Sequence, residues 1–281
     1  MWSSCSDRGG TMETQSISEK IEKNKVEEDA KPFVSPCRKL DALAPMRWLR
    51  KGWEDFKRAP VHSLTYGFVM MLFSILISAL AYKVGSFTMV IVMMAGFIFI
   101  GPALAMGLYS ISCQLEKAGR VRFFQCIRQG RKRLGNQMIL AFALLIVFLV
   151  WARAASMVHI FVPATTDGSL GSLILFLLVG SAVGSLFALV IFCSTVFAIP
   201  MIMDRDVDAV TAMLTSFNAV LRNKPAMFVW AMAIVIGMLF GFMTFYLGLM
   251  VILPIIGHAT WHGYRETIIA DDWPQDPDTQ S

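Results

Sequence analysis

Charged residues are scarce in this chain. Asp, Glu, Lys and Arg make up 16% of its 281 residues, whereas a soluble domain carries about a quarter. Hydrophobic residues make up 56%, which argues against an ordinary soluble domain. The pI near 9.0 does not indicate nucleic-acid binding. The basic residues flank hydrophobic runs, where they suit membrane orientation and binding to anionic lipid headgroups.

Signatures of catalysis are also missing. The chain contains no GxSxG, Walker loop or HExxH motif, and its five cysteines form neither a CxxC pair nor a zinc-binding spacing. No acidic residue lies inside a hydrophobic run, which argues against a proton-coupled pump. We therefore expect no enzyme activity and no cofactor.

Long hydrophobic runs are what the chain does contain. A helix needs about 20 apolar residues to cross the hydrocarbon layer, and backbone amides cannot stay unpaired there. Five runs meet this length, at residues 61–82, 87–112, 138–162, 170–203 and 226–253. The sequence predicts an all-α, polytopic membrane helix bundle.

One pattern recurs three times along the chain. Pro60, Gly135 and Pro225 each stand at the start of an apolar run, and each follows an amphipathic basic segment. Three copies of an amphipathic helix plus a hairpin predict six membrane spans. The last copy must then divide residues 226–264 into two spans, with the turn at Gly248. Periodicity alone also permits one long tilted span there, and five in total.

The first amphipathic segment reads PMRWLRKGWEDFKRAP and covers residues 45–60. Its aromatic residues fall on one helical face, and its basic residues supply the charge. We expect a helix at the headgroup boundary, with Trp48 and Trp53 as interfacial anchors and anionic lipid as the partner. Trp261 is the corresponding anchor near the end of the last span. An ordinary solvated helix is the alternative for residues 45–60.

Three regions follow from this pattern. Residues 1–37 mix charges of both signs with little apolar content, so we expect a disordered tail. Residues 38–265 form the transmembrane helical domain, and residues 266–281 form a polar tail.

Basic residues gather on one predicted side of the membrane. They occur in residues 38–58, 113–137 and 204–225, while the opposite side shows Lys83 and Arg153. Under the positive-inside rule, both termini lie in the cytoplasm.

Glycine and proline mark predicted packing sites and kinks. Small residues let helices approach closely, and proline removes an intrahelical hydrogen bond. The predicted packing glycines are Gly96, Gly101, Gly107, Gly180, Gly184, Gly237 and Gly241, and the predicted kinks are at Pro102, Pro200 and Pro254. The GSAVGS motif around Gly180 and Gly184 suits assembly with a second copy or another membrane protein.

Two histidines are the sharpest chemical candidates. His258 and His262 stand four residues apart on a predicted helix, so both rings can face one metal ion. Two ligands do not complete a site, and a belt of aromatic and histidine side chains at the membrane boundary explains them more simply. We therefore expect no metal.

A polar cluster ends the fourth run. Asp204, Arg205, Asp206 and Asp208 suit either a cation or partner site, or acids that favour the dipole of the following helix. The second explanation is simpler, and it makes Asp206 or Asp208 the N-cap.

Four stretches resemble one family. They read RWLRKGWEDFKRAPVHSLTYG, GFIFIGPALAMGLYSISCQLE, PMIMDRDVDAVTAMLTS and LPIIGHATWHGYR. Together, from about Pro45 to Arg265, they are similar to bacterial predicted integral membrane proteins with domain of unknown function 2189. The resemblance implies a multi-pass protein of the cell inner membrane, and it implies no activity. The sequence thus favours a non-enzymatic scaffold or envelope component. A transporter or channel for a small or lipid-like solute is the alternative, followed by a metal or haem protein using His258 and His262.

Overall fold

The computed structural model describes residues 33–84, 104–117, 119, 121–122, 134–161 and 170–275. The chain divides into two units, Met1–Phe33 and Val34–Ser281. Helices are the regular elements of the described residues, in which the β-structure is limited to isolated bridges. The predicted all-α fold is therefore confirmed.

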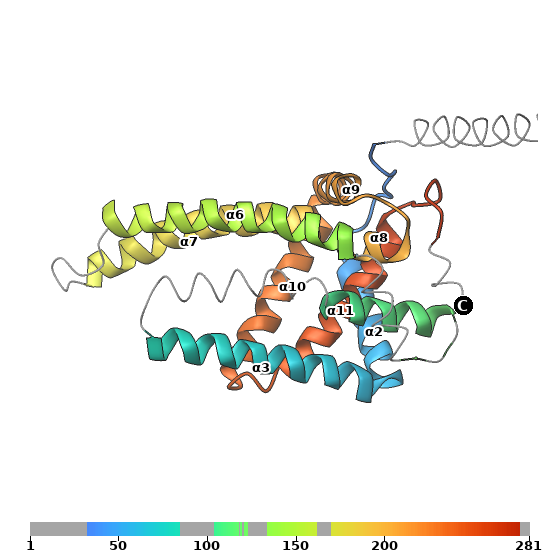
Figure 1. Cartoon of the computed structure of the whole chain (residues 1–281), viewed down its shortest axis with the longest axis horizontal. Helices are drawn as coiled ribbons and strands as arrows, with labels where there is room; N and C mark the ends of the chain where they lie inside the picture. Colours follow the sequence, from blue (N-terminus) through green and yellow to red (C-terminus); the bar gives the residue numbers. More distant parts are fainter. Residues whose placement is uncertain are drawn as a thin grey trace, which may run out of the picture. The chain divides into compact units, whose positions relative to one another are not determined.

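Eight labelled helices make up most of the second unit (Figure 1). They are α2 (Ala44–Arg58), α3 (Pro60–Val84), α6 (Leu134–Phe161), α7 (Leu170–Thr195), α8 (Ala198–Asp204), α9 (Ala209–Arg222), α10 (Lys224–Met243) and α11 (Leu249–Thr267). A further helical stretch covers residues 104–117. The markers Pro60, Gly135 and Pro225 each lie within the first two residues of a helix, as the repeat predicts. The second predicted amphipathic segment lies mostly outside the described residues.

Four of these helical segments are long and apolar enough to cross a membrane. They are Pro60–Leu80, Gly135–Val158, Leu170–Asp204 and Lys224–Met243. Most of the predicted second span, residues 87–112, lies outside the described residues. The remaining predicted span corresponds to α11. This helix is not among the segments apolar enough to cross a membrane, because its second half carries many polar side chains.

Helix α11 is the centre of the described fold. It packs against α2, α3, α8 and α10. Glycine makes the closest of these approaches possible, because a Cβ on Gly52 of α2 would lie 2.7 Å from the carbonyl oxygen of Ile255 and 2.8 Å from the amide nitrogen of Ala259. Gly257 of α11 likewise faces Leu108, where a Cβ would lie 2.8 Å from that side chain.

The last hydrophobic run forms two helices. Helix α10 ends at Met243 and α11 begins at Leu249, so one continuous helix over this run is the wrong alternative. Gly248 lies in the turn between the two helices, as predicted, and its φ is −62°. The left-handed residues of the turn are Phe245 and Tyr246, with φ of 53° and 69°. A Cβ on Gly248 would collide with the hydroxyl of Thr244 and lie 3.1 Å from the Cα of Gly241, so this glycine also permits close packing of the hairpin.

The fourth run is interrupted before Pro200. Helix α7 ends at Thr195, and Pro200 lies in the first turn of α8, where a missing amide hydrogen costs little. Ser216 of α9 bridges the break, since its hydroxyl donates to the carbonyl of Cys193 and accepts from the amide of Phe197. Pro254 lies inside α11, and Pro102 lies outside the described residues.

The predicted packing glycines have different surroundings. A Cβ on Gly107 would collide with the ring of Tyr66, one on Gly237 would lie 3.0 Å from Ile252, and one on Gly241 would run into Leu249. Gly180 has nothing within 4 Å among the described residues. A Cβ on Gly184 would lie 3.9 Å from Nε1 of Trp151, an ordinary van der Waals contact. Gly96 and Gly101 lie outside the described residues.

Two of the three predicted interfacial tryptophans are buried inside the protein. Trp48 and Trp261 are 0% exposed, whereas Trp53 is 44% exposed. Trp48 packs edge-on against Trp230, with ring centroids 5.7 Å apart, and its Nε1 donates to Glu266. The amphipathic pattern of α2 therefore reflects packing on α11, and Trp48 and Trp261 do not contact lipid as anchors.

The segments at the two ends of the second unit pair with each other. Cys37 and Ile268 form an antiparallel bridge, in which the amide of Arg38 donates to Thr267 and that of Ile269 donates to Pro36. We call residues 35–40 and 267–269, together with Asn223, the terminal clasp. Asn223 accepts from the amide of Leu40 at 2.8 Å and donates to the carbonyl of Arg38 at 3.0 Å.

This pairing corrects two predicted boundaries. Residues 34–37 belong to the helical unit and not to the tail predicted over residues 1–37, because Ser35 and Cys37 are buried there. Part of the predicted polar tail 266–281 is also packed, since Ile268 and Trp273 are buried. Residues 1–32 lie outside the described residues.

The pairing of Cys37 with Ile268 predicts that a cysteine introduced at residue 268 can form a disulfide with Cys37. Cys37 and Ile268 form a pair whose flanking residues make the hydrogen bonds, and in such pairs the Cα atoms are about 4.5 Å apart, which suits an S–S bond. The Ile268→Cys variant, oxidised in membranes, should gain an intramolecular disulfide to Cys37, seen as a mobility shift that reductant reverses. The Ile268→Cys, Cys37→Ser variant should not shift. Absence of the bond in folded Ile268→Cys protein would contradict the clasp.

Asp208 is the N-cap of α9. Its Oδ1 accepts from the amides of Val210 and Thr211, both at 2.9 Å, which confirms the predicted cap. Burial alone would raise the pKa of Asp208, but hydrogen bonds from Thr211 and Val210 outweigh it and hold the pKa below its ordinary 3.8. The charged cap therefore stabilises the fold above that pH and loses this contribution as pH falls through the lowered pKa.

Replacement of this cap has a measurable cost. Asp208→Ala should lower the free energy of unfolding by about 1 kcal/mol at neutral pH, because two amides of α9 lose their acceptor. Equilibrium unfolding in mixed micelles measures the change. The gap between wild type and variant should narrow at pH 3. A gap independent of pH would show that the carboxylate charge contributes nothing.

Candidate functional site

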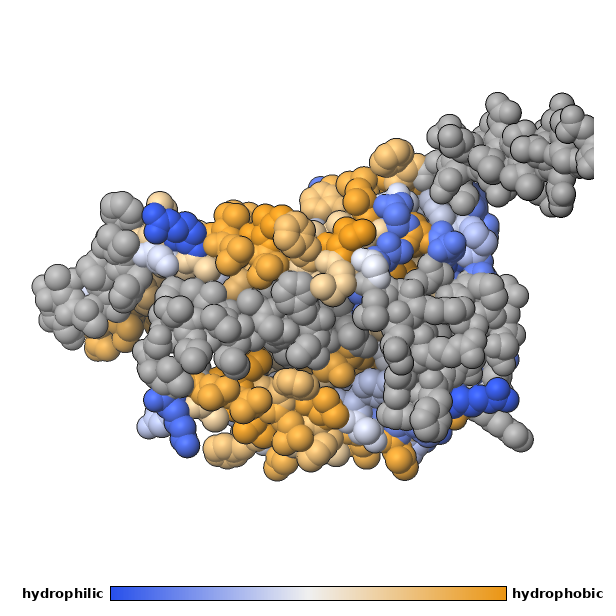
Figure 2. Space-filling view, in the orientation of Figure 1, coloured by the Kyte–Doolittle hydropathy of each residue, from blue (hydrophilic) through white to orange (hydrophobic). Residues whose placement is uncertain are grey.

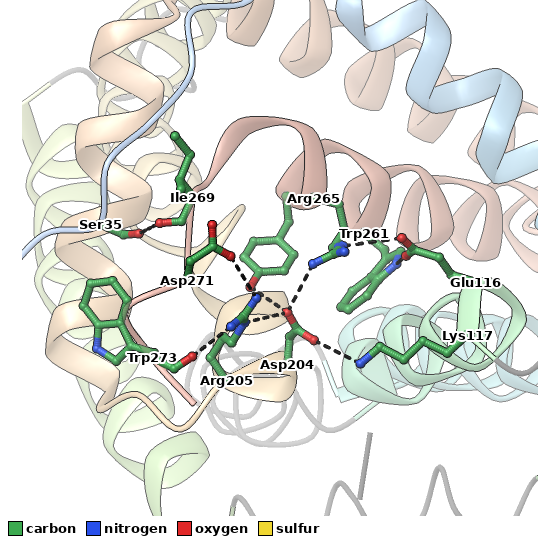
Figure 3. Close-up of polar contacts among 11 residues, drawn as sticks. Ser35, Glu116, Lys117, Asp204, Arg205, Trp261, Arg265, Ile269, Asp271 and Trp273 are labelled. Atoms are coloured by element: carbon green, nitrogen blue, oxygen red, sulfur yellow. Dashed lines mark hydrogen bonds and ion pairs between the residues drawn. The ribbon is translucent and has the colours of Figure 1, made fainter. Parts of the chain in front are cut away.

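A charged cluster surrounds the buried Asp204 at the end of α8 (Figure 3). The carboxylate is 0% exposed, and its Oδ2 accepts from the hydroxyl of Tyr264 at 3.0 Å and from Nε of Arg205 at 3.2 Å. Burying a carboxylate is costly unless it is paired and hydrogen-bonded. The guanidinium of Arg205 and the hydroxyl of Tyr264 therefore offset the cost of burying this carboxylate.

Further charges approach the same carboxylate from other elements. Nζ of Lys117 lies 3.7 Å from Asp204 Oδ1, and Nη1 of Arg265 lies 3.8 Å from Oδ2. Glu116 in turn pairs with Nε of Arg265 at 3.5 Å and accepts from Nε1 of Trp261 at 3.0 Å. We call these residues the Asp204 cluster: Glu116, Lys117, Asp204, Arg205, Trp261, Tyr264 and Arg265.

The segment after α11 closes over the cluster. Nη1 of Arg205 donates to the carbonyl of Trp273 at 2.8 Å, and Nη2 lies 3.6 Å from Asp271. Next to it, the amide of Asp206 donates to the carbonyl of Pro274. The cluster thus ties together the ends of three helical segments and the following chain.

The Asp204 cluster has the chemistry of a structural ion-pair network, and we call this its locking role. Together with Asp271, the cluster holds three acidic and three basic side chains, so its formal charges balance. The acids are Glu116, Asp204 and Asp271, and the bases are Lys117, Arg205 and Arg265. Among the described residues, Asp204 Oδ1 is one of two buried side-chain atoms without a hydrogen bond, and Lys117 is the cation nearest to it. Such a mutually neutralised set, with Asp204 and Arg205 buried at its centre, fixes the relative position of chain segments and offers no activated nucleophile.

A second polar cluster surrounds His258 of α11. Its Nδ1 hydrogen-bonds to the hydroxyl of Ser112 at 2.8 Å, and its Nε2 hydrogen-bonds to that of Ser63 at 2.9 Å. The ring is 0% exposed. His262, one turn later, turns to α2 and contacts Asp55, with Nε2 2.8 Å from Oδ2.

The histidines therefore do not converge on a metal ion. Both ring nitrogens of His258 already have partners, and His262 binds a different residue. Within the described part of the chain, no group of three His, Cys, Asp or Glu side chains can hold a metal. The described cysteines, Cys37, Cys113 and Cys193, are free thiols.

Sequence reasoning identified Asp204 and Arg205 but not their partners. The sequence suggests that Asp204 interacts with the dipole of the next helix, α9. In the structure, Asp204 instead accepts a hydrogen bond from Tyr264 of α11, 60 residues later in the chain. Glu116 and Lys117 were part of a basic loop, and nothing in their spacing indicated a contact with Asp204. One feature of the sequence could have indicated burial. Asp204 and Arg205 directly follow the apolar segment IPMIM, so they are close in the chain to residues expected to be buried.

These helices define a class of protein. Among the described residues, which are mainly helical, four apolar segments are long enough to cross a bilayer, and they make the chain an integral membrane protein. Residues 89–204 match the family described as predicted integral membrane protein, domain of unknown function 2189, and this match confirms the family resemblance over that segment. No curated protein and no solved structure matches the chain.

The family match covers three residues of the Asp204 cluster. The match ends at Asp204 and includes Glu116 and Lys117, while Tyr264 and Arg265 lie beyond it. The cluster therefore joins the matched segment to the last helix of the chain.

Proposed function

We propose that this protein is a non-enzymatic scaffold or envelope component of the bacterial inner membrane. It crosses the bilayer six times, with both termini in the cytoplasm. The terminal clasp supports this topology, because Pro36 and Arg38 hydrogen-bond directly to Ile269 and Thr267. Two segments that pair in this way lie on one side of the membrane, and an even number of spans follows.

The observation that carries the scaffold role is the mutual pairing of buried polar side chains. His258 is held by Ser63 and Ser112, His262 by Asp55, and Asp204 by Arg205 and Tyr264. These contacts hold α2, α3, α8 and α11 in fixed positions. The polar groups thus stabilise one arrangement of helices, which is the requirement for a scaffold.

A gene deletion tests the proposal against other functions. The deletion strain is profiled for metabolites, lipids and metals, and is complemented with wild type or with the His258→Ala, His262→Ala double variant. A scaffold predicts defects in the envelope and no single accumulated solute. The double variant should rescue in proportion to its folded amount. Loss of one metal, or failure of rescue by well-folded variant, would contradict the scaffold role.

A transporter or channel for a small or lipid-like solute is the second candidate. The buried group of Ser63, Ser112 and His258 favours it, since polar side chains between membrane helices often line a solute path. Accumulation or depletion of one solute class in the deletion strain would support this candidate over the scaffold.

A further inference from the structure

Helix α9 carries an exposed apolar stripe. Val210, Leu214, Phe217 and Leu221 are 49%, 44%, 39% and 50% exposed. Their spacing of four, three and four residues places them on one face of the helix. The opposite face is made of small side chains, among them Ala212, Thr215, Ser216 and Ala219, and is buried. Figure 2 shows hydrophobic side chains gathered over the α9 region, beside hydrophilic ones.

The connections of α9 restrict where this stripe can lie. The candidate span Leu170–Asp204 precedes the helix, and the candidate span Lys224–Met243 follows it directly after Asn223. A 14-residue helix is about 21 Å long at 1.5 Å per residue. Both of its ends are therefore tied to the ends of membrane spans, and α9 cannot move away from the bilayer surface.

An exposed apolar side chain also occurs at the start of the next helix. Leu221 at the end of α9 is followed by Phe228, which is 68% exposed on the first turns of α10. Arg222 and Lys224 are also exposed between them. Long basic side chains at this position reach phosphate groups while their stems lie along apolar surface.

Helix α2, the corresponding helix of the first repeat, differs from α9. Both helices occupy the same position in the repeat, but the apolar face of α2 is covered by α11. In α9 the contact face is built from small residues, so the large apolar side chains point outward.

We propose that α9 lies in the plane of the cytoplasmic leaflet, with Val210, Leu214, Phe217 and Leu221 in contact with lipid acyl chains. The inference rests on the proposed topology for the choice of leaflet. A wrong topology would appear as misplaced termini, whereas the contact of α9 with lipid is read separately, from cross-linked products.

Photo-cross-linking tests the proposal in the full chain. The photoreactive residue p-benzoyl-phenylalanine replaces Phe217, and Leu214 in a second variant guards against misfolding of the first. Leu177, 54% exposed within a candidate span, is the lipid-facing control, and Arg50, 80% exposed at its side chain on α2, is the water-facing control. The probes are proteoliposomes of phosphatidylethanolamine and phosphatidylglycerol, and native membranes.

The expected result is a lipid adduct, identified by mass spectrometry, at Phe217 and Leu214 with a yield close to that at Leu177 and severalfold above that at Arg50. Cross-links to a second copy in proteoliposomes, or to another protein in native membranes, would overturn the proposal. Yields at Phe217 and Leu214 as low as at Arg50 would also overturn it, because they would place the stripe in water.

Discussion

Asp204→Asn should lower the free energy of unfolding by about 3 to 5 kcal/mol, the cost of removing one partner from a buried ion pair. The substitution keeps the size of the side chain and removes its charge. Arg205, whose side chain is 8% exposed, then stays buried without its nearest anion. Tyr264 also faces a weaker acceptor. Equilibrium unfolding in mixed micelles, with fluorescence-detected size exclusion as a check on folding, measures the loss.

Asp41→Asn is the matched control. This substitution makes the same chemical change in an ion pair with Arg47 whose side chains are 55% and 48% exposed. Water and salt screen such pairs, so the control should be close to wild type. Equal losses in the two variants would contradict a locking role for the Asp204 cluster. The Asp204→Asn, Arg205→Met double variant should recover part of the loss, because it no longer buries an unpaired charge.

Gly52→Leu should separate α2 from α11 and destabilise the protein by about 3 kcal/mol, at the upper end of typical overpacking costs. A Cβ at this position would lie 2.7 Å from a backbone oxygen and 2.8 Å from a backbone nitrogen. Backbone atoms inside a helix cannot rotate away as a side chain does, so the two helices must move apart. The transition temperature in detergent should fall sharply, and Trp48 should become more exposed to a quencher of indole fluorescence.

Gly180→Leu is the control for the glycine prediction. Nothing among the described residues lies within 4 Å of a Cβ at Gly180, so the isolated chain should keep its stability. If the GSAVGS face packs against a second copy, this variant should change the oligomeric state without changing the unfolding of the monomer. Destabilisation equal to that of Gly52→Leu would mean that helix propensity, and not close packing, explains both effects.

Local patterns predicted the helices well. The runs that start near Pro60, Gly135 and Pro225 became α3, α6 and α10, because a long apolar segment has few alternatives to a helix in a membrane. The N-cap role of Asp208 also followed from local chemistry, since a cap bonds to amides two and three residues away. Both features depend on neighbours in the sequence.

Contacts between distant residues were not predictable in this way. The apolar face of α2 suggested lipid, but the sequence does not state whether lipid or another helix covers such a face, and α11 covers it here. The pairing of Ser63 and Ser112 with His258 has the same character, because each serine alone is an ordinary helix residue. The sequence does not distinguish the surroundings of the glycines either: a Cβ on Gly107 would collide with Tyr66, whereas one on Gly180 would have nothing within 4 Å among the described residues.

The central claim is that residues 35–40 pair with residues 267–269 in the terminal clasp, so that both chain termini lie on the same side of the bilayer. Reporter tags at each end of the full chain, one active only in the cytoplasm and the other only outside it, test this claim most directly. The account predicts cytoplasmic activity at both ends. External activity at one end, with cytoplasmic activity at the other, would contradict the even number of spans and the clasp together.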